Sequence, residues 1–278
     1  DLLSKEVYFV GENGQGKSNL LEALYYAAYG SSFRTHNDAQ LIRQGTQGFS
    51  ISALYSQQNS SVQKINVMYE NGVKKIEKNN KRIQDRKELI NTIPCVLFCH
   101  DDMQFATGDP ESRRFFLDQS LTMFDPLYID DLRSYKKVLK NRNLLLKEKT
   151  YEMLDVYDVQ LAQSGLEIQK KRKNAVFQFN EIFGKLYEQI SGIAGVSILY
   201  SPSWKELPDT VGTRFPSKDD ICALLAGRHD QDKIMETTMS GPHRDRIIFM
   251  YEGRPFIPVA STGQQRLVAL LLRVAQAV

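Results

Sequence analysis

The chain has 278 residues, of which 42% are hydrophobic and 25% are charged; this composition is typical of globular proteins and excludes a disordered or fibrous chain. The length suits one large domain or two modest domains with buried cores. The formal net charge of +3 does not by itself indicate a polyanionic partner, and no apolar run reaches the ~18 residues that a membrane span needs.

The first predicted elements are a short buried strand at residues 7–10, a glycine-rich loop, and a helix that ends near Gly30. The loop reads GENGQGKS and fits the phosphate-loop pattern G-x-x-x-x-G-K-[ST] at every fixed position. Its glycines let backbone N–H groups point at phosphate oxygens, and the helix that begins near Lys17 directs its positive dipole end there. We expect ATP and Mg²⁺ to bind here, with Lys17 on the β- and γ-phosphates and Ser18 on the metal ion. The predicted nucleotide-binding residues are Gly11, Glu12, Asn13, Gly14, Gln15, Gly16, Lys17, Ser18 and Asn19.

Residues 49–90 are predicted to form β-hairpins. Asn71-Gly72 lies between two strand-like runs, which is a strong hairpin signal, and a second turn follows in EKNNKRI. Seven basic residues and two acidic ones occur between Lys74 and Lys87, so this segment is either a solvated hairpin face or a surface that contacts DNA phosphates. The candidate DNA-binding residues are Lys74, Lys75, Lys78, Lys81 and Arg82.

A second apolar run, residues 96–99, predicts a buried strand that leads to Asp101 and Asp102. Either carboxylate could bind Mg²⁺, which leaves a monomeric P-loop NTPase or kinase as an open alternative. The three cysteines lack zinc-site spacing and no His pattern lies near them, so we expect free thiols in a cytoplasmic protein.

Residues 110–190 are dominated by helical patterns and are predicted to pack as an antiparallel pair or bundle. A strand at GVSILYSPSW and a further helix follow, with Trp204 expected in the core. Basic residues on these helices are solvated faces or DNA contacts. They are Lys136, Lys137, Lys140, Lys147 and Lys149, and the run Lys170, Lys171, Arg172 and Lys173.

The C-terminal stretch predicts a hairpin around Glu252-Gly253 and then the turn STGQQR, residues 261–266, at the start of an apolar helix. Ser261 and Gln264 have capping-box spacing, so each side chain should bind the backbone N–H of the other. The turn carries more polar groups than a cap needs, and a helix N-terminus of this kind is also an anion site.

This turn resembles the signature motif of ABC-type ATPases in chromosome-maintenance and repair proteins. Together with GENGQGKSNLLEAL, GSSFRTHNDAQLI, VLFCHDDMQFATGDPESRRFFLDQSL and SGPHRD, it resembles the RecF family of bacterial recombination mediators from about residue 7 to residue 275. The resemblance implies an α/β fold: an ABC-type ATPase head, with a P-loop, a mixed sheet and a β-hairpin subdomain, and a second, mainly helical lobe. The expected divisions are residues 1–108 for the N-terminal part of the ATPase lobe, 109–235 for the helical lobe, and 236–278 for the return to the ATPase lobe.

The resemblance also implies a function. Such proteins bind ATP and Mg²⁺, dimerise head to tail around ATP, bind double-stranded DNA and single-strand/double-strand junctions, hydrolyse ATP weakly, and help to load RecA with RecR and RecO. The γ-phosphate would be contacted by the signature residues of a second copy, which are Ser261, Thr262, Gly263, Gln264, Gln265 and Arg266.

The resemblance places the catalytic carboxylate in an acidic strand after the signature helix, and the sequence stops at Val278 before that strand, so no catalytic residue is predicted. The family usually has Ser-Pro-Glu-Asp where residues 99–102 read CHDD, which leaves the metal role of Asp101 or Asp102 open. Another ABC-type head is the nearest alternative.

Overall fold

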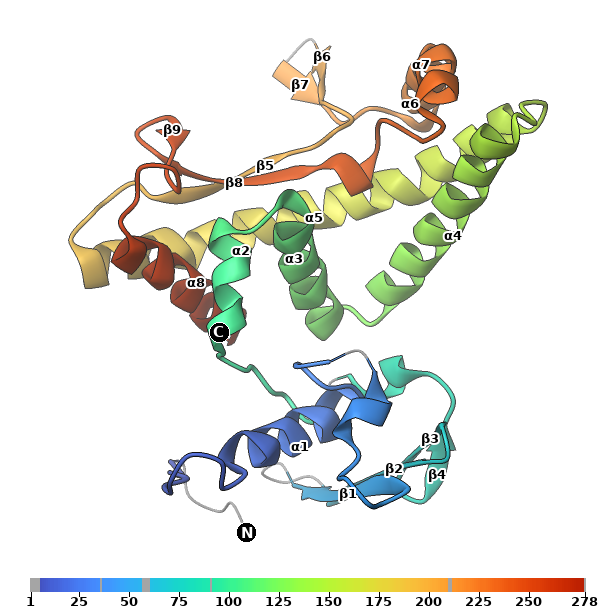
Figure 1. The fold of residues 1–278 in the computed structure, drawn as a ribbon. Helices are drawn as coiled ribbons and strands as arrows, with labels where there is room; N and C mark the ends of the chain where they lie inside the picture. Colours follow the sequence, from blue (N-terminus) through green and yellow to red (C-terminus); the bar gives the residue numbers. More distant parts are fainter. Residues whose placement is uncertain (1–5, 36, 57–60, 91, 210–211, 278) are drawn as a thin grey trace. The chain divides into compact units, whose positions relative to one another are not determined.

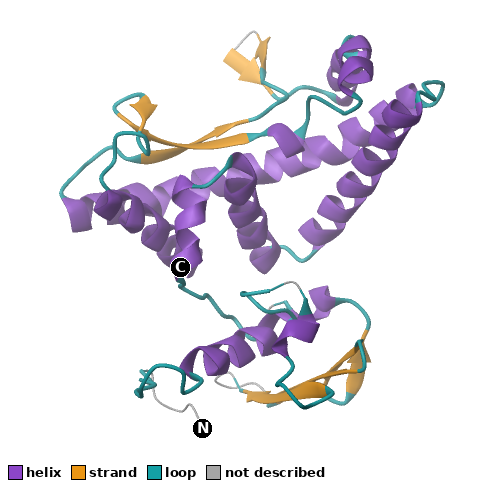
Figure 2. Ribbon diagram, in the orientation of Figure 1, coloured by secondary structure: helices purple, strands orange, loops and turns teal. Residues whose placement is uncertain are grey.

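A computed structural model describes residues 6–35, 37–56, 61–90, 92–209 and 212–277. The chain forms two compact units, Asp1–Leu97 and Phe98–Val278. Every strand ladder among the described residues is antiparallel. Helices make up most of the second unit, and a strand meander faces one helix in the first (Figure 2).

The first unit is built from helix α1 and a four-stranded sheet (Figure 1). Tyr26 of α1 is fully buried against Ile65 and Val67 of the sheet, which holds the helix in place. Asn71 and Asn79 have φ of 51° and 52°, as the tight left-handed turns of β-hairpins require, so the predicted hairpins are confirmed. The elements are α1 (Lys17–Tyr29), η1 (Asp38–Leu41), β1 (Gly48–Tyr55), β2 (Gln63–Glu70), β3 (Val73–Lys78), β4 (Lys81–Ile83) and η2 (Arg86–Leu89).

Two predicted strands are wrong. Residues 7–10 and 96–99 have no regular structure, and the side chain of Val10 is 93% exposed. A strand needs a neighbour to receive its N–H and C=O groups, and neither stretch pairs with a described strand, because β1 to β4 pair only with one another. Without a partner strand, each of these two apolar segments forms a loop.

The second unit is organised along helix α5, which has 38 residues. The sheet β5-β8-β9 packs on one side of α5, and helices α2, α3 and α8 lie on the other (Figure 1). The helices are η3 (His100–Asp102), α2 (Met103–Thr107), α3 (Pro110–Phe124), α4 (Leu127–Glu148), α5 (Leu154–Ser191), α6 (Lys218–Ala226), α7 (His229–Met235), η4 (Pro242–Arg244) and α8 (Thr262–Ala277). The strands are β5 (Ser197–Ser201), β6 (Leu207–Asp209), β7 (Gly212–Arg214), β8 (Arg246–Tyr251) and β9 (Arg254–Pro255).

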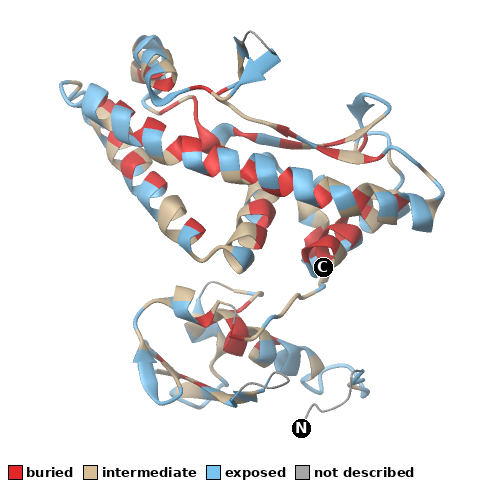
Figure 3. Cartoon of the chain, turned by 180° about the vertical axis from the view of Figure 1, so that it is seen from behind, coloured by how far each residue is buried: buried red, intermediate tan, exposed pale blue. Residues whose placement is uncertain are grey.

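Helices α4 and α5 form the predicted pair, and buried residues recur along the length of α5 (Figure 3). Trp204 is buried in this core, as predicted. The buried guanidinium of Arg142 on α4 donates to Asp158 of α5 and to Asp232 of α7, at 2.7 Å each. This ion-paired group fixes three helices to one another, because an unpaired buried charge would be strongly destabilising.

Candidate nucleotide-binding site

The phosphate loop takes its shape from its glycines. Gly14 and Gly16 have φ of 84° and 86°, a left-handed conformation that other residues rarely adopt. A Cβ at either position would meet no atom within 4 Å, so the backbone conformation, and not crowding, requires glycine there. The loop residues on both sides are exposed, and a ligand can therefore approach the backbone closely.

Lys17 lies across this loop. Its Nζ donates to the carbonyl oxygens of Gly11 and Glu12, at 2.6 and 2.7 Å. No side chain caps the N-terminus of α1, and its first turn holds no acidic residue. The free N–H groups, the helix dipole and the ammonium group therefore form a positive site suited to a phosphate.

Beside this loop lies a group in which Asn19 was predicted from the sequence, whereas Glu22 and Arg34 were not. Arg34 Nη1 donates to Asn19 Oδ1 and to Glu22 Oε2, at 3.0 Å each. Glu22 is buried on α1, and Ser32 donates to its other carboxylate oxygen. One feature of the sequence could have indicated this ion pair: Glu22 is an acidic residue on the inner face of an apolar helix, and Arg34 follows it 12 residues later. Asn19, Glu22 and Arg34 line a cavity of about 740 Å³ that begins at the end of the phosphate loop.

The turn at residues 261–266 has the predicted capping box. Gln264 Oε1 accepts from the Ser261 N–H at 2.7 Å, and Ser261 Oγ accepts from the Gln264 N–H at 3.3 Å. The Gln265 amide donates to the carbonyl oxygens of Ile257 and Ala260, at 3.1 Å each. Gln264 and Gln265 therefore hold the turn. Four residues of the turn are exposed, namely Ser261, Thr262, Gly263 and Arg266.

Asp102 is a structural residue of the second unit. Its carboxylate accepts from Arg273 of α8, at 2.8 Å from Nη2, and from the Cys99 N–H at 2.8 Å. Asp102 and Arg273 are both buried, whereas Asp101 is exposed. The metal role of Asp101 or Asp102 stays a prediction, and only Asp101 has an exposed carboxylate.

We expect Asp102→Ala to destabilise the chain by about 3 kcal/mol, because it leaves the Arg273 charge buried without its carboxylate. Urea denaturation, monitored by circular dichroism, measures the change in the free energy of unfolding. Asp101→Ala is the matched control and should unfold at the wild-type urea concentration; if Asp101 binds Mg²⁺, the same variant will show weaker Mg²⁺-dependent ATP binding. Equal stability of the Asp102 variant and wild type would contradict the structural role.

Three of the five predicted DNA-binding residues have partners inside the first unit. Lys74 pairs with Asp38 at 2.6 Å, and Lys75 pairs with Glu77 at 2.7 Å. Lys78 donates to the Thr92 hydroxyl, also at 2.7 Å. The side chains of the other two are exposed and make no hydrogen bond or ion pair to a described residue; these are Lys81 and Arg82.

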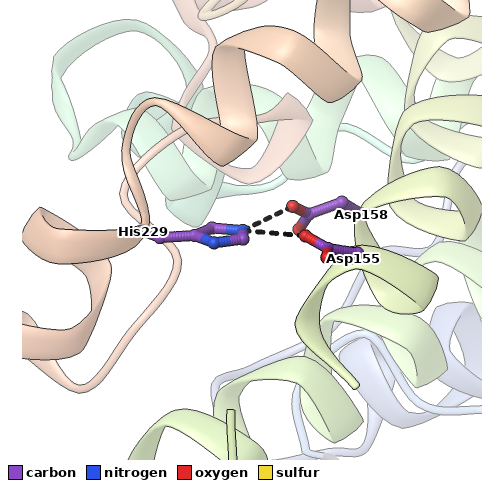
Figure 4. A group of neighbouring side chains, drawn as sticks. All are labelled: Asp155, Asp158 and His229. Atoms are coloured by element: carbon purple, nitrogen blue, oxygen red, sulfur yellow. Dashed lines mark hydrogen bonds and ion pairs between the residues drawn. The ribbon is translucent and has the colours of Figure 1, made fainter. Parts of the chain in front are cut away.

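A further group of possible metal ligands lies in the second unit. Asp155, Asp158 and His229 have ligand atoms within 4.8 Å of one another (Figure 4). Asp158 already bonds His229 Nε2 at 2.7 Å through one oxygen and Arg142 through the other. The positive guanidinium of Arg142 beside Asp158 disfavours the binding of a cation there. The hydrogen bond between Asp158 and His229 instead links α5 to α7.

The three cysteines are free thiols, as predicted. Burial raises the pKa of the Cys95 and Cys99 thiols, and the nearby Asp102 carboxylate raises that of Cys99 further, so both stay protonated at neutral pH. In the part of the chain that the structure describes, no helix has both the length and the apolar content needed to cross a membrane.

The loop and the helix that follows it define a P-loop ATPase domain, and residues 1–193 match the AAA domain family. The chain is 45% identical to the DNA replication and repair protein RecF of Treponema pallidum (strain Nichols), over all of this chain and 76% of that protein. It is 30% identical to the protein of the same name from Leptospira interrogans serovar Lai, over 99% of this chain and 74% of that protein. The chain belongs to the RecF family.

Solved structures agree with this assignment. The fold matches a structure described as the recombination mediator protein RecF-ATPrS in the RecFOR pathway, with a TM-score of 0.86 and 29% identity over 96% of this chain and 72% of that one. A RecF-ATP structure of the same pathway gives a TM-score of 0.84 and 30% identity over 95% and 72%. The predicted α/β ATPase head with a helical lobe is thereby confirmed.

Proposed function

We propose that this chain is an ATP-dependent DNA-binding protein of recombinational gap repair. It binds ATP, dimerises around it to clamp double-stranded DNA and its junctions with single strands, and helps RecR and RecO to load RecA. The observation that carries the proposal is the phosphate loop, with Lys17 turned onto the carbonyl groups of Gly11 and Glu12 beside an uncapped helix N-terminus. Two similar solved structures described as RecF-ATPrS and RecF-ATP support ATP as the ligand.

Lys17 would exchange its two carbonyl partners for the β- and γ-phosphates, which bind an ammonium group more strongly because they carry full charge. The Ser18 hydroxyl lies in the exposed first turn of α1 and suits Mg²⁺, which prefers oxygen ligands. When bound, Mg²⁺ would neutralise charge on the phosphates. Arg34 lies beside Asn19 at the same end of the loop, and its charge is paired with that of Glu22.

The γ-phosphate would also meet the signature turn of a second copy. Ser261 and Gly263 are exposed at the N-terminus of α8, where N–H groups and the helix dipole favour an anion. A Cβ on Gly263 would meet nothing nearer than Ser261 Oγ at 3.9 Å, so packing within the chain does not require glycine there. Glycine in a helix costs about 1 kcal/mol relative to alanine, and close approach of a ligand to this backbone is a reason to keep it.

The two contacts together explain how ATP would control the protein. A ligand that binds the dimer better than the monomer shifts the equilibrium toward the dimer, and hydrolysis would reverse the shift. The proposed ATPase lobe comprises residues 1–108 and 236–278, with residues 109–235 as the helical lobe. The catalytic carboxylate is not assigned.

Sedimentation with and without ATP and Mg²⁺, and with a short duplex, tests this proposal. We expect monomers without nucleotide, dimers with ATP, and a heavier species when the duplex is added. A protein that binds ATP and remains monomeric would contradict the clamp and would favour the P-loop NTPase or kinase that uses Asp101 or Asp102.

A further inference from the structure

Helix α4 presents an exposed lysine-rich surface. No acidic residue occurs between Leu132 and Lys147. Four lysines in this span are exposed, and they are called here the α4 lysine face: Lys136, Lys137, Lys140 and Lys147. None of the four makes a hydrogen bond or ion pair to a residue that the structure describes.

The packing of α4 fixes the direction of this face. Tyr135, Val138, Arg142 and Leu146 are buried against the rest of the second unit. At about 100° per residue, the four lysines lie within an arc of roughly 100° on the opposite side of the helix. At about 1.5 Å per residue, they extend over roughly 16 Å of its length.

The lysines near the middle of the neighbouring helix α5 have ion-pair partners, unlike those of the α4 lysine face. Lys170 pairs with Glu167 at 3.0 Å, Lys171 pairs with Asp125 at 2.8 Å, and Lys173 pairs with Glu206. Each of these three charges has a carboxylate partner within the chain, although Lys170 and Lys173 are exposed, so the basic run that looked equivalent in the sequence is largely neutralised. On α4, four like charges share one face with no carboxylate among them, which is mildly destabilising without an external anion.

We propose that the α4 lysine face binds the phosphate backbone of double-stranded DNA. A row of roughly 16 Å is long enough to meet several phosphates of a duplex, which carries one negative charge per ~3.4 Å of axis on each strand. Protein–protein interface cores are depleted of lysine and enriched in aromatic residues, and this face has four lysines and no aromatic residue, so DNA fits it better than an acidic protein does. The lysines would contact phosphates without reading sequence. This inference rests on the proposed function.

A triple variant with a charge-matched control tests the inference. Lys136→Gln, Lys140→Gln and Lys147→Gln remove three charges from the face. Lys170→Gln, Lys173→Gln and Lys233→Gln remove three charges that are in ion pairs with Glu167, Glu206 and Asp230. Both triples change the net charge equally. The first should melt at or slightly above the wild-type temperature, because its three lysines make no hydrogen bond or ion pair to a described residue and their mutual repulsion is removed.

Fluorescence anisotropy measures the affinity for a short duplex in the presence of ATP. The measurement is repeated over a series of salt concentrations. The α4 triple should bind at least about tenfold more weakly at low salt, and its slope of log K against log salt should be shallower by roughly 2 to 3. The control triple should stay within about twofold of wild type, with a slope change below about one.

The outcomes separate the inference from the proposed function. A wild-type chain that does not bind duplex with ATP contradicts the proposed function, and the inference with it. If the wild type binds with a steep salt dependence and the α4 triple binds equally well, the inference is wrong and the function stands, with Lys81, Arg82 and Lys149 among the remaining candidates. Equal loss in both triples would mean that net charge alone matters, and this also overturns the inference.

Discussion

Lys17→Ala is expected to abolish ATP binding, with a loss of affinity of at least ~100-fold. Each hydrogen bond from a charged group contributes about 1.5–3 kcal/mol, and Lys17 is placed to make two, since its Nζ already holds two carbonyl oxygens of the loop. A loss of ~3 kcal/mol corresponds to more than a hundredfold in the dissociation constant. Titration calorimetry with ATP and Mg²⁺ measures the change directly.

Two controls make the Lys17 result specific. Lys81→Ala removes an exposed lysine of the same unit and should leave ATP affinity unchanged. The Lys17 variant should also keep its helical content, because α1 is held by Tyr26 in the core and not by the lysine. ATP affinity equal to that of wild type in a folded Lys17 variant would overturn the phosphate-loop assignment.

The loss of ATP binding should remove the later steps as well. If ATP shifts the monomer–dimer equilibrium, the Lys17 variant will remain monomeric at ATP concentrations that saturate the wild type. Its duplex binding should then fall to that of the nucleotide-free protein. The α4 triple behaves differently, because it should lose DNA affinity and still dimerise with ATP.

Features determined by neighbouring residues could be predicted from the sequence. The phosphate loop, the Asn71-Gly72 hairpin and the Ser261–Gln264 cap each depend on backbone conformations or hydrogen bonds within a few residues. The two strands expected at residues 7–10 and 96–99 required partner strands, and strand-like composition does not say whether a partner is present.

The site features that escaped prediction depend on contacts distant in the sequence. Arg273 binds Asp102 across 171 positions, and nothing in a single sequence indicates this pair. The lysine clusters are the clearest case, because a count of charges treats all lysines alike. The structure separates Lys74, which is held by Asp38, from Lys140, which has no such partner among the described residues.

The second large effect is expected at the signature turn. Ser261→Arg should leave ATP binding by the monomer intact and block ATP-induced dimerisation. The arginine would fill the exposed position where the γ-phosphate of a second copy should lie, and it would remove a helix cap worth about 1 kcal/mol. Sedimentation with saturating ATP measures the dimer, and calorimetry measures the affinity.

Loss of the cap has to be separated from loss of the interface. Ser217 heads α6 with its own capping box to Asp220, so Ser217→Arg removes an equivalent cap from another helix. We expect this control to lose similar stability and to dimerise normally with ATP. Failure of both variants to dimerise would mean that stability, and not the signature turn, limits assembly.

Ser261→Asp separates the two roles of the serine within one position. Aspartate caps a helix as well as serine does, and its charge favours a helix N-terminus. The fold should therefore keep its stability, whereas the carboxylate would repel the γ-phosphate and prevent dimerisation. An ATP-dependent mass shift that survives both Ser261→Arg and Ser261→Asp would leave Ser261 as a helix cap and nothing more.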